Sequence, residues 1–161
     1  RWCLMLLWHL LPHVFGALPL LDTKPNVIWI LMDDFGYNDW GLHNRRNSHE
    51  MRTPHMDALA TDPHGVHLER FYSQPICTPT RLQMLSGRYQ IHTGMQHGVL
   101  WQMQVNGLPK NETTIAEYLR PLGYATHAIG KWHIGMTELW RTPLRRGFDS
   151  FFGFWGGSED Y

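Results

Sequence analysis

The residues with the clearest chemical potential lie in one short stretch of sequence, PICTPTRLQMLSGR. Thr78 suits the N-cap of a helix, and Pro79 suits the first helical position. Gly87 suits a C-cap, so we predict a short helix from Pro79 to about Ser86. The thiol of Cys77 would then lie immediately before the helix N-terminus.

Cys77 and Arg81 together suggest a site for anion chemistry. Backbone N–H groups and the positive end of the helix dipole favour a negative charge beside Cys77. Arg81, near the end of the first turn, adds a fixed cation with a planar fork of donors. For an isolated Cys-x-Pro-x-Arg the alternative is a buried cysteine that opens an ordinary helix, because short motifs often match by chance.

Two adjacent aspartates follow the apolar run VIWILM at residues 27–32. A run without alternation predicts a strand buried on both faces, as in a parallel α/β sheet. Asp33 and Asp34 would fall at the carboxyl end of this strand, where ligands gather in open sheets. Adjacent carboxylates repel each other, and a hard divalent cation would relieve that repulsion. Solvated aspartates in a strand-end turn are the alternative.

A second predicted strand, residues 124–129, runs into the sequence GKWH. If both strands belong to one parallel sheet, the aspartates, Lys131, His133 and the Cys77 turn converge on one edge. Lys131 would supply positive charge to a tetrahedral anion, and His133 a titratable donor or acceptor. A basic turn with an exposed lysine is the alternative, and the presence of Cys77 and Arg81 favours the site.

Local patterns predict three further elements between these segments. The first is a helix that begins at Thr53-Pro54 and continues to Ala60, and the second is a half-exposed strand at residues 66–72. The third is a helix at residues 115–119, which begins with a capping box formed by Thr114 and Glu117 and ends before Pro121.

The order of these motifs resembles the sulfatase family, and within it the arylsulfatase B-like branch. The resemblance covers residues 24–161 and rests on the sequences DD, CTPTR, LSGR, GKWHIG, RRGFD and GSEDY. It implies an α/β fold, namely an alkaline phosphatase-like sandwich with a largely parallel central sheet flanked by helices. It also implies a sulfuric ester hydrolase of the arylsulfatase or N-acetylgalactosamine-4-sulfatase type.

In such enzymes a formylglycine-generating enzyme converts the motif cysteine to formylglycine (3-oxoalanine) during synthesis. The resemblance implies that Cys77 is this residue and that a hydroxyl of its aldehyde hydrate attacks the sulfur of a sulfate ester. The alcohol or phenol then leaves, and the second hydroxyl expels sulfate. Calcium (Ca²⁺) would be held by Asp33, Asp34 and the group derived from Cys77.

The resemblance also gives roles to the basic residues. Arg81 would fix the hydrate, Lys131 would bind a sulfate oxygen, and His133 would assist the hydrate. The expected substrates are sulfated small molecules or glycosaminoglycans. Three positions depart from the usual family pattern: Thr80 replaces serine, Leu82 replaces a small residue and Ser86 replaces threonine.

Residues 1–22 are predicted to be a signal peptide, with small residues at Gly16-Ala17 for cleavage. A membrane span is the alternative, but no stable span is expected. Asn111 begins an N-glycosylation sequon, consistent with a lysosomal or extracellular destination. Residues 23–161 are interpreted as the N-terminal part of a catalytic domain. We expect this fragment alone to be inactive, and its aromatic tail at residues 141–161 to pack against later sequence.

Composition and charge exclude other classes. The net charge is zero, so bulk electrostatics predict no nucleic-acid partner. Cys3 lies in the predicted signal peptide, so Cys77 would have no disulfide partner. A related phosphate-ester hydrolase would use serine or threonine as nucleophile, and Cys77 argues against it. A catalytically silent, secreted sulfatase-like binding protein with an unmodified thiol stays as the alternative function.

Overall fold

The structure is a computed structural model that describes residues 24–44 and 51–160. The chain divides into two compact units, residues 1–35 and residues 36–161. The predicted signal peptide, residues 1–22, lies outside the described residues. Within the described ranges, no helix has the length and apolar character that a membrane span requires.

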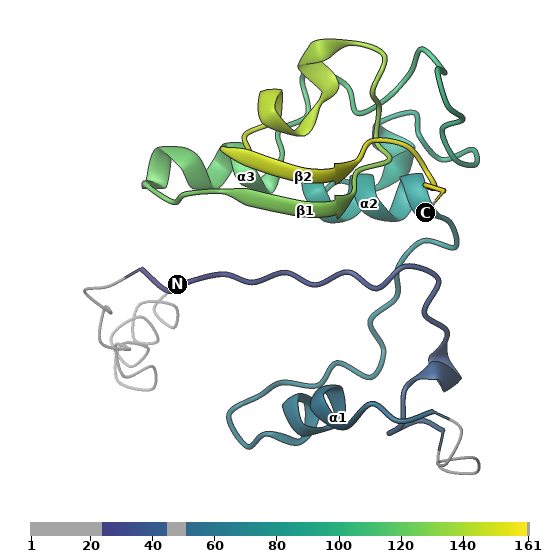
Figure 1. The fold of residues 1–161 in the computed structure, drawn as a ribbon, viewed down its shortest axis with the longest axis vertical. Helices are drawn as coiled ribbons and strands as arrows, with labels where there is room; N and C mark the ends of the chain where they lie inside the picture. The colour runs from purple at the N-terminus through teal and green to yellow at the C-terminus, as the bar shows by residue number, and fades with distance from the viewer. Residues whose placement is uncertain (1–23, 45–50, 161) are drawn as a thin grey trace, which may run out of the picture. The chain divides into compact units, whose positions relative to one another are not determined.

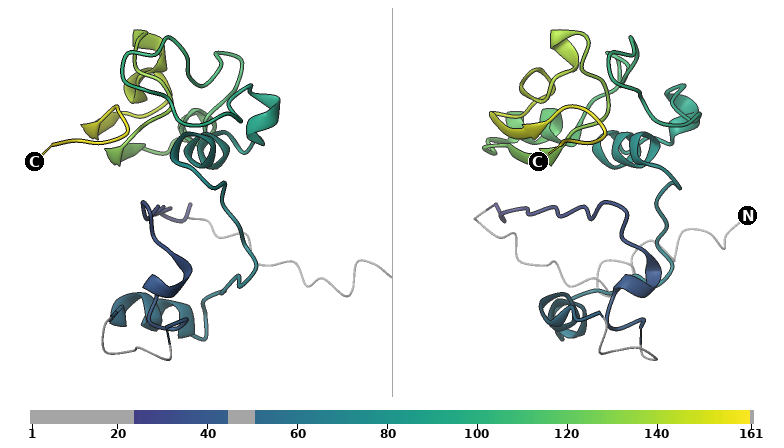
Figure 2. Two further views of the ribbon diagram at one scale, coloured as in Figure 1. Left: turned by 90° about the vertical axis from the view of Figure 1, so that its right-hand side faces the viewer. Right: turned by 45° about the vertical axis from the view of Figure 1, so that its right-hand side comes forward.

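Among the described residues, the helices and strands lie in the larger unit (Figure 1). They are α1 (Pro54–Thr61), α2 (Cys77–Ser86), α3 (Ile115–Leu119), β1 (His127–Lys131) and β2 (Ser150–Phe154). Short 3-10 helices connect them, namely η2 (Tyr37–Asp39), η3 (Gln90–His92), η4 (Arg120–Leu122), η5 (Leu139–Arg141) and η6 (Pro143–Arg145). Figures 1 and 2 show α2 and α3 on the same face of the β1–β2 ribbon.

β1 and β2 form a parallel pair in which Gly130 is the register partner of Gly153. The pairing continues beyond the strands, because the backbone N–H of His133 donates to the carbonyl of Trp155 at 3.0 Å. On the outer face, Ile129 is 85% exposed and its register partner Phe152 is 80% exposed. A parallel pair of strands with helices on one face agrees with the predicted α/β class.

The buried core lies between α2, the loop that follows it and the end of β1. It comprises Leu82, Leu85, Met95, Leu100, Leu108, Trp132 and Ile134. Two aromatic residues from the C-terminal segment, Phe148 and Phe151, pack against this cluster. Part of the aromatic tail therefore packs within the chain itself, and its packing against later sequence stays a prediction.

α2 begins two residues earlier than predicted, at Cys77, with Ile76 as an extended N-cap residue. Thr78 is not the N-cap: its hydroxyl has partners outside the helix, as described below. The predicted C-cap is confirmed, since Gly87 adopts a left-handed conformation at φ +66° and its N–H donates to the carbonyl of Gln83.

The predicted capping box of α3 is confirmed in both directions. The Glu117 N–H donates to the Thr114 hydroxyl at 3.2 Å, and the Thr114 N–H donates to the Glu117 carboxylate at 2.7 Å. Pro121 lies in the 3-10 turn that follows α3, and left-handed Gly123 closes this turn. α1 begins at Pro54 as predicted.

Two predicted strands are not formed in the structure, and a third is displaced. Residues 27–32 and 66–72 are assigned to no strand, and most of their side chains are exposed. A strand needs a partner for its backbone, and an apolar or alternating pattern does not supply one. β1 starts at His127 rather than at Tyr124, because its extent is set by pairing with β2.

Asp149 joins the chain before β1 to the chain before β2. Its Oδ2 accepts hydrogen bonds from the Thr126 backbone N–H at 2.9 Å and from the Thr126 hydroxyl at 3.2 Å. The Arg120 guanidinium lies 3.3 Å from the other carboxylate oxygen. These contacts hold the pKa of Asp149 below its ordinary value. The hydrogen bond from the Thr126 backbone lowers the pKa most, and the Thr126 hydroxyl and the charge of Arg120 lower it further.

This lowered pKa predicts an acid-sensitive contribution to stability. The folded carboxylate binds a proton less readily than the unfolded one, so its contribution is present above the unfolded-state pKa and is lost as the pH falls through the folded-state pKa. Asp149→Asn should therefore be less stable than wild type at neutral pH, and the difference should shrink below about pH 4.

Urea unfolding of the full-length protein at neutral and acidic pH measures this difference. Asp160→Asn is the matched control, because Asp160 is exposed in the C-terminal segment. A difference between Asp149→Asn and wild type that stays constant with pH would contradict the assignment.

Candidate active site

The N-terminus of α2 and the end of β1 bring two predicted residues together. Cys77, the first residue of α2, is half-buried, and the ammonium of Lys131 lies 3.3 Å from its sulfur. The two residues are 54 positions apart in the chain. The larger unit therefore places the Lys131 side chain beside the cysteine, where a positive charge favours the thiolate over the thiol.

Arg81 ties the first turn of α2 to the same strand. Its guanidinium is buried, and its Nη1 donates to the backbone carbonyl of Lys131 at 2.7 Å. The planar guanidinium presents its donors in a fixed geometry, so this bond limits the movement of α2 against β1. Cys77 and Lys131 are thus positioned by a contact between their own elements.

His133 lies two residues beyond β1 and is buried at 5% exposure. Its backbone adopts an unusual φ of +56°, and its Nε2 lies 2.7 Å from the carbonyl oxygen of Leu100. The chain passes close to the ring at Gly157, where a Cβ atom would lie 2.6 Å from the imidazole Cε1. His133 is therefore held from two sides and is not an exposed residue of a basic turn.

Thr78 is a residue of this site that sequence analysis assigned to a different role. Its side chain is fully buried, and its hydroxyl donates to the carbonyl of His133 at 3.0 Å. The same hydroxyl accepts the N–H of Leu100 at 3.1 Å. These partners are 55 and 22 positions away, so no local pattern could have indicated them.

Asp33 and Asp34 belong to the smaller unit, residues 1–35. Both side chains are exposed in a bend of the chain, and Asp34 adopts a positive φ of 51°. Exposed, consecutive carboxylates are hard oxygen donors of the kind that calcium takes as ligands. Their chemistry therefore fits a calcium ion.

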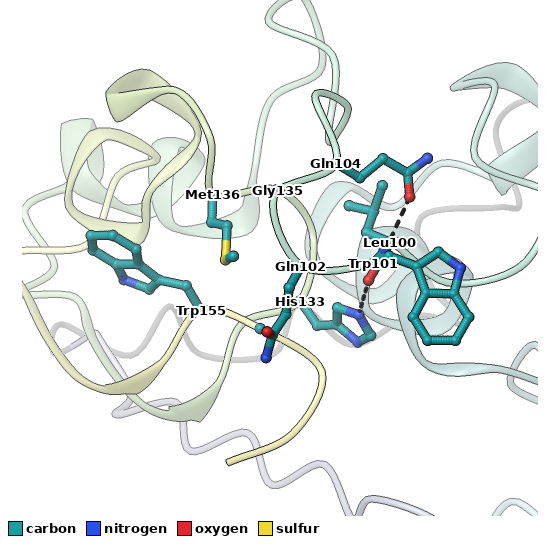
Figure 3. Close-up of a pocket in the computed structure, with 9 residues that line it drawn as sticks. Leu100, Trp101, Gln102, Gln104, His133, Gly135, Met136 and Trp155 are labelled. Carbon is teal, nitrogen blue, oxygen red and sulfur yellow. Dashed lines mark hydrogen bonds between the residues drawn. The ribbon is translucent and has the colours of Figure 1, made fainter. Parts of the chain in front are cut away.

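A small pocket adjoins His133 in the larger unit (Figure 3). Its walls come from the segment after Leu100 and from the two segments that follow β1 and β2. They comprise Leu100, Trp101, Gln102, Gln104, His133, Gly135, Met136, Trp155 and Gly156. The lining combines aromatic faces with side-chain amides.

Sequence comparison agrees with this arrangement. Residues 25–161 match the Sulfatase family. Mouse (Mus musculus) arylsulfatase J is 47% identical over 139 residues, which is 86% of this chain and 22% of that protein. Pig (Sus scrofa) N-acetylgalactosamine-6-sulfatase is 35% identical over 158 residues, covering 91% of this chain and 29% of that protein. The chain belongs to the sulfatase family.

Solved structures show the same fold. The crystal structure of Ps i-CgsB matches with a TM-score of 0.71 and 32% identity, covering 86% of this chain and 30% of that one. The PsFucS1 sulfatase from Pseudoalteromonas sp. matches with a TM-score of 0.66 and 31% identity, covering 80% of this chain and 25% of that one. The predicted alkaline phosphatase-like α/β class is confirmed. The chain spans less than a third of the length of each of these relatives.

Proposed function

We propose that this chain forms part of a sulfuric ester hydrolase in which Cys77 is converted to formylglycine. The observation that carries the proposal is the Lys131 ammonium 3.3 Å from the Cys77 sulfur, at the first residue of a helix. Helix N-H groups and a lysine favour negative charge at one point. The names of the relatives, arylsulfatase and N-acetylgalactosamine-6-sulfatase, support the same reaction.

The basic residues of the larger unit would then orient the ester. Lys131 would bind a sulfate oxygen and stabilise the charge that develops on it, because preorganised charge is usually a large part of catalysis. Arg81 would hold the first turn of α2 against Lys131 through the bond to its carbonyl. His133 would hold or move a proton beside the group derived from Cys77.

Two groups would complete the chemistry. Formylglycine supplies a nucleophilic hydroxyl when hydrated, and a calcium ion supplies positive charge that polarises sulfate oxygens. Asp33 and Asp34, together with the group derived from Cys77, would hold this ion. The two exposed carboxylates have the oxygen donors that such an ion requires.

The proposed substrates are sulfate esters of a sugar or of an aromatic alcohol, consistent with N-acetylgalactosamine-6-sulfatase and arylsulfatase J among the relatives. We place the protein in the secretory pathway, with a lysosomal or extracellular destination. Asn111 is exposed, as its proposed glycosylation requires. The formylglycine-generating enzyme would be its partner during synthesis.

Peptide mass spectrometry of the full-length protein, secreted from eukaryotic cells, tests this proposal. We expect the tryptic peptide of residues 71–81 to be about 18 Da lighter than the thiol form and to react with an aldehyde-trapping reagent. Cys77→Ala is the matched control, since its peptide should react with no trapping reagent. An unmodified thiol in cells that contain the modifying enzyme would instead support the silent binding protein.

A further inference from the structure

Thr78, Leu100 and His133 form a closed ring of three hydrogen bonds. The Thr78 hydroxyl donates to the His133 carbonyl at 3.0 Å and accepts the Leu100 N–H at 3.1 Å. A third hydrogen bond, of 2.7 Å between the His133 Nε2 and the Leu100 carbonyl oxygen, closes the ring. All three residues are buried, with Thr78 at 0% exposure. Figure 3 shows the bond between His133 and Leu100.

This ring determines which imidazole nitrogen carries the proton. A backbone carbonyl only accepts hydrogen bonds, so Nε2 must be the donor to Leu100. In the neutral imidazole the lone pair then resides on Nδ1. The tautomer of His133 consequently depends on where the Leu100 carbonyl lies, and the Thr78 hydroxyl binds the N–H of the same residue.

We propose that Thr78 is a positioning residue that fixes the orientation and the tautomer of His133 relative to Cys77. The expected effect on catalysis rests on the proposed function, whereas the expected effect on the tautomer of His133 rests on the three hydrogen bonds alone. Thr78 is adjacent to Cys77 in the first turn of α2. Its one hydroxyl therefore couples the position of Cys77 to the backbone of His133 and to the acceptor of the His133 ring.

Thr126 provides a matched comparison for a hydroxyl that is merely structural. It is also buried, donates to a backbone carbonyl, that of Gly147, and accepts a backbone N–H, that of Asp149 at 3.2 Å. It lies immediately before β1, at the opposite end of the strand from Lys131. Thr126→Val and Thr78→Val thus remove the same pair of backbone hydrogen bonds, but only Thr78 touches the site. Thr126→Val also removes the contact of 3.2 Å between the hydroxyl and the Asp149 carboxylate, so it is at least as demanding a control for stability.

The first test compares kinetics in the full-length protein on an aryl sulfate. Because catalysis is sensitive to small displacements of catalytic groups, we expect Thr78→Val to lower kcat by about 10- to 100-fold while KM changes little. Thr78→Ser keeps the hydroxyl and should restore most of the activity. Thr126→Val should stay within about twofold of wild type, even if it is equally destabilised.

Thr78 lies inside the sequence that the modifying enzyme would read, so each kcat is divided by the aldehyde content measured by mass spectrometry. If the corrected kcat of Thr78→Val matches that of Thr126→Val, the positioning role is overturned. The positioning role is also overturned if the loss of kcat in Thr78→Val disappears once kcat is divided by the aldehyde content.

The second test needs no activity. The ring nitrogens of ¹⁵N-histidine report the tautomer by NMR at alkaline pH, where imidazole is neutral, and the His133 signals are assigned from their loss in His133→Asn. We expect the proton on Nε2 in wild type and a mixture of tautomers in Thr78→Val. A proton on Nδ1 in wild type overturns the proposal. An inactive wild type that keeps the Nε2 proton would refute the proposed sulfatase function and leave the ring intact.

Discussion

Lys131→Met in the full-length protein is expected to lower kcat/KM for an aryl sulfate by about 100- to 1,000-fold. The Lys131 ammonium lies 3.3 Å from the Cys77 sulfur, where the proposed nucleophile would form and where charge would develop on the ester. Methionine keeps the length and the apolar stem of the side chain but removes the charge and its donors. The loss corresponds to roughly 3 to 4 kcal/mol of transition-state stabilisation.

Lys110→Met is the matched control, because Lys110 is exposed in the loop before α3. It should leave kcat/KM within about twofold of wild type. Aldehyde content at Cys77 is measured in both variants, so that incomplete modification is separated from slow chemistry. Equal activity in the two variants would remove Lys131 from the proposed site.

Gly153→Ala is expected to destabilise the protein by about 3 kcal/mol or more, measured by urea unfolding of the full-length protein. A Cβ atom at Gly153 would overlap the backbone of Gly130, with its carbonyl carbon and nitrogen both at 2.7 Å. These atoms belong to the neighbouring strand and cannot turn aside as a flexible side chain can. Relief requires β1 and β2 to separate, which would also displace Lys131.

Gly130→Ala separates this steric effect from backbone strain. Gly130 has a φ of +104°, but a Cβ atom there would meet no atom within 4 Å. We expect it to cost only about 1 to 2 kcal/mol, the strain of a left-handed conformation for an L-residue. If both alanine variants unfold at the same urea concentration, close approach of the two strands is not what requires glycine at residue 153.

Elements whose signals are local were predictable from the sequence. The capping box of Thr114 and Glu117 satisfies donors within one helical turn, so the four residues involved specify it. Gly87 ends α2 because only its own φ must be left-handed. The motifs around Cys77 and Lys131 likewise identified the two residues that the structure places side by side.

Features that depend on distant partners were not predictable. The apolar run at residues 27–32 indicates a buried strand, yet it carries no information about which backbone would pair with it. Thr78 has the chemistry of an N-cap, and local rules place it there. Its hydroxyl instead binds Leu100 and His133, because the fold brings their backbone groups to it.

The burial of the first turn of α2 has a consequence for the timing of synthesis. Thr78, Pro79 and Arg81 are buried in the folded chain, so an enzyme that reads the Cys-x-Pro-x-Arg sequence needs it before folding. The Thr78 hydroxyl binds the carbonyl of His133, a residue that is synthesised 55 positions after Thr78. At typical synthesis rates of about 5 to 20 residues per second, this delay is roughly 3 to 11 s. The proposed modification of Cys77 would thus compete with chain elongation.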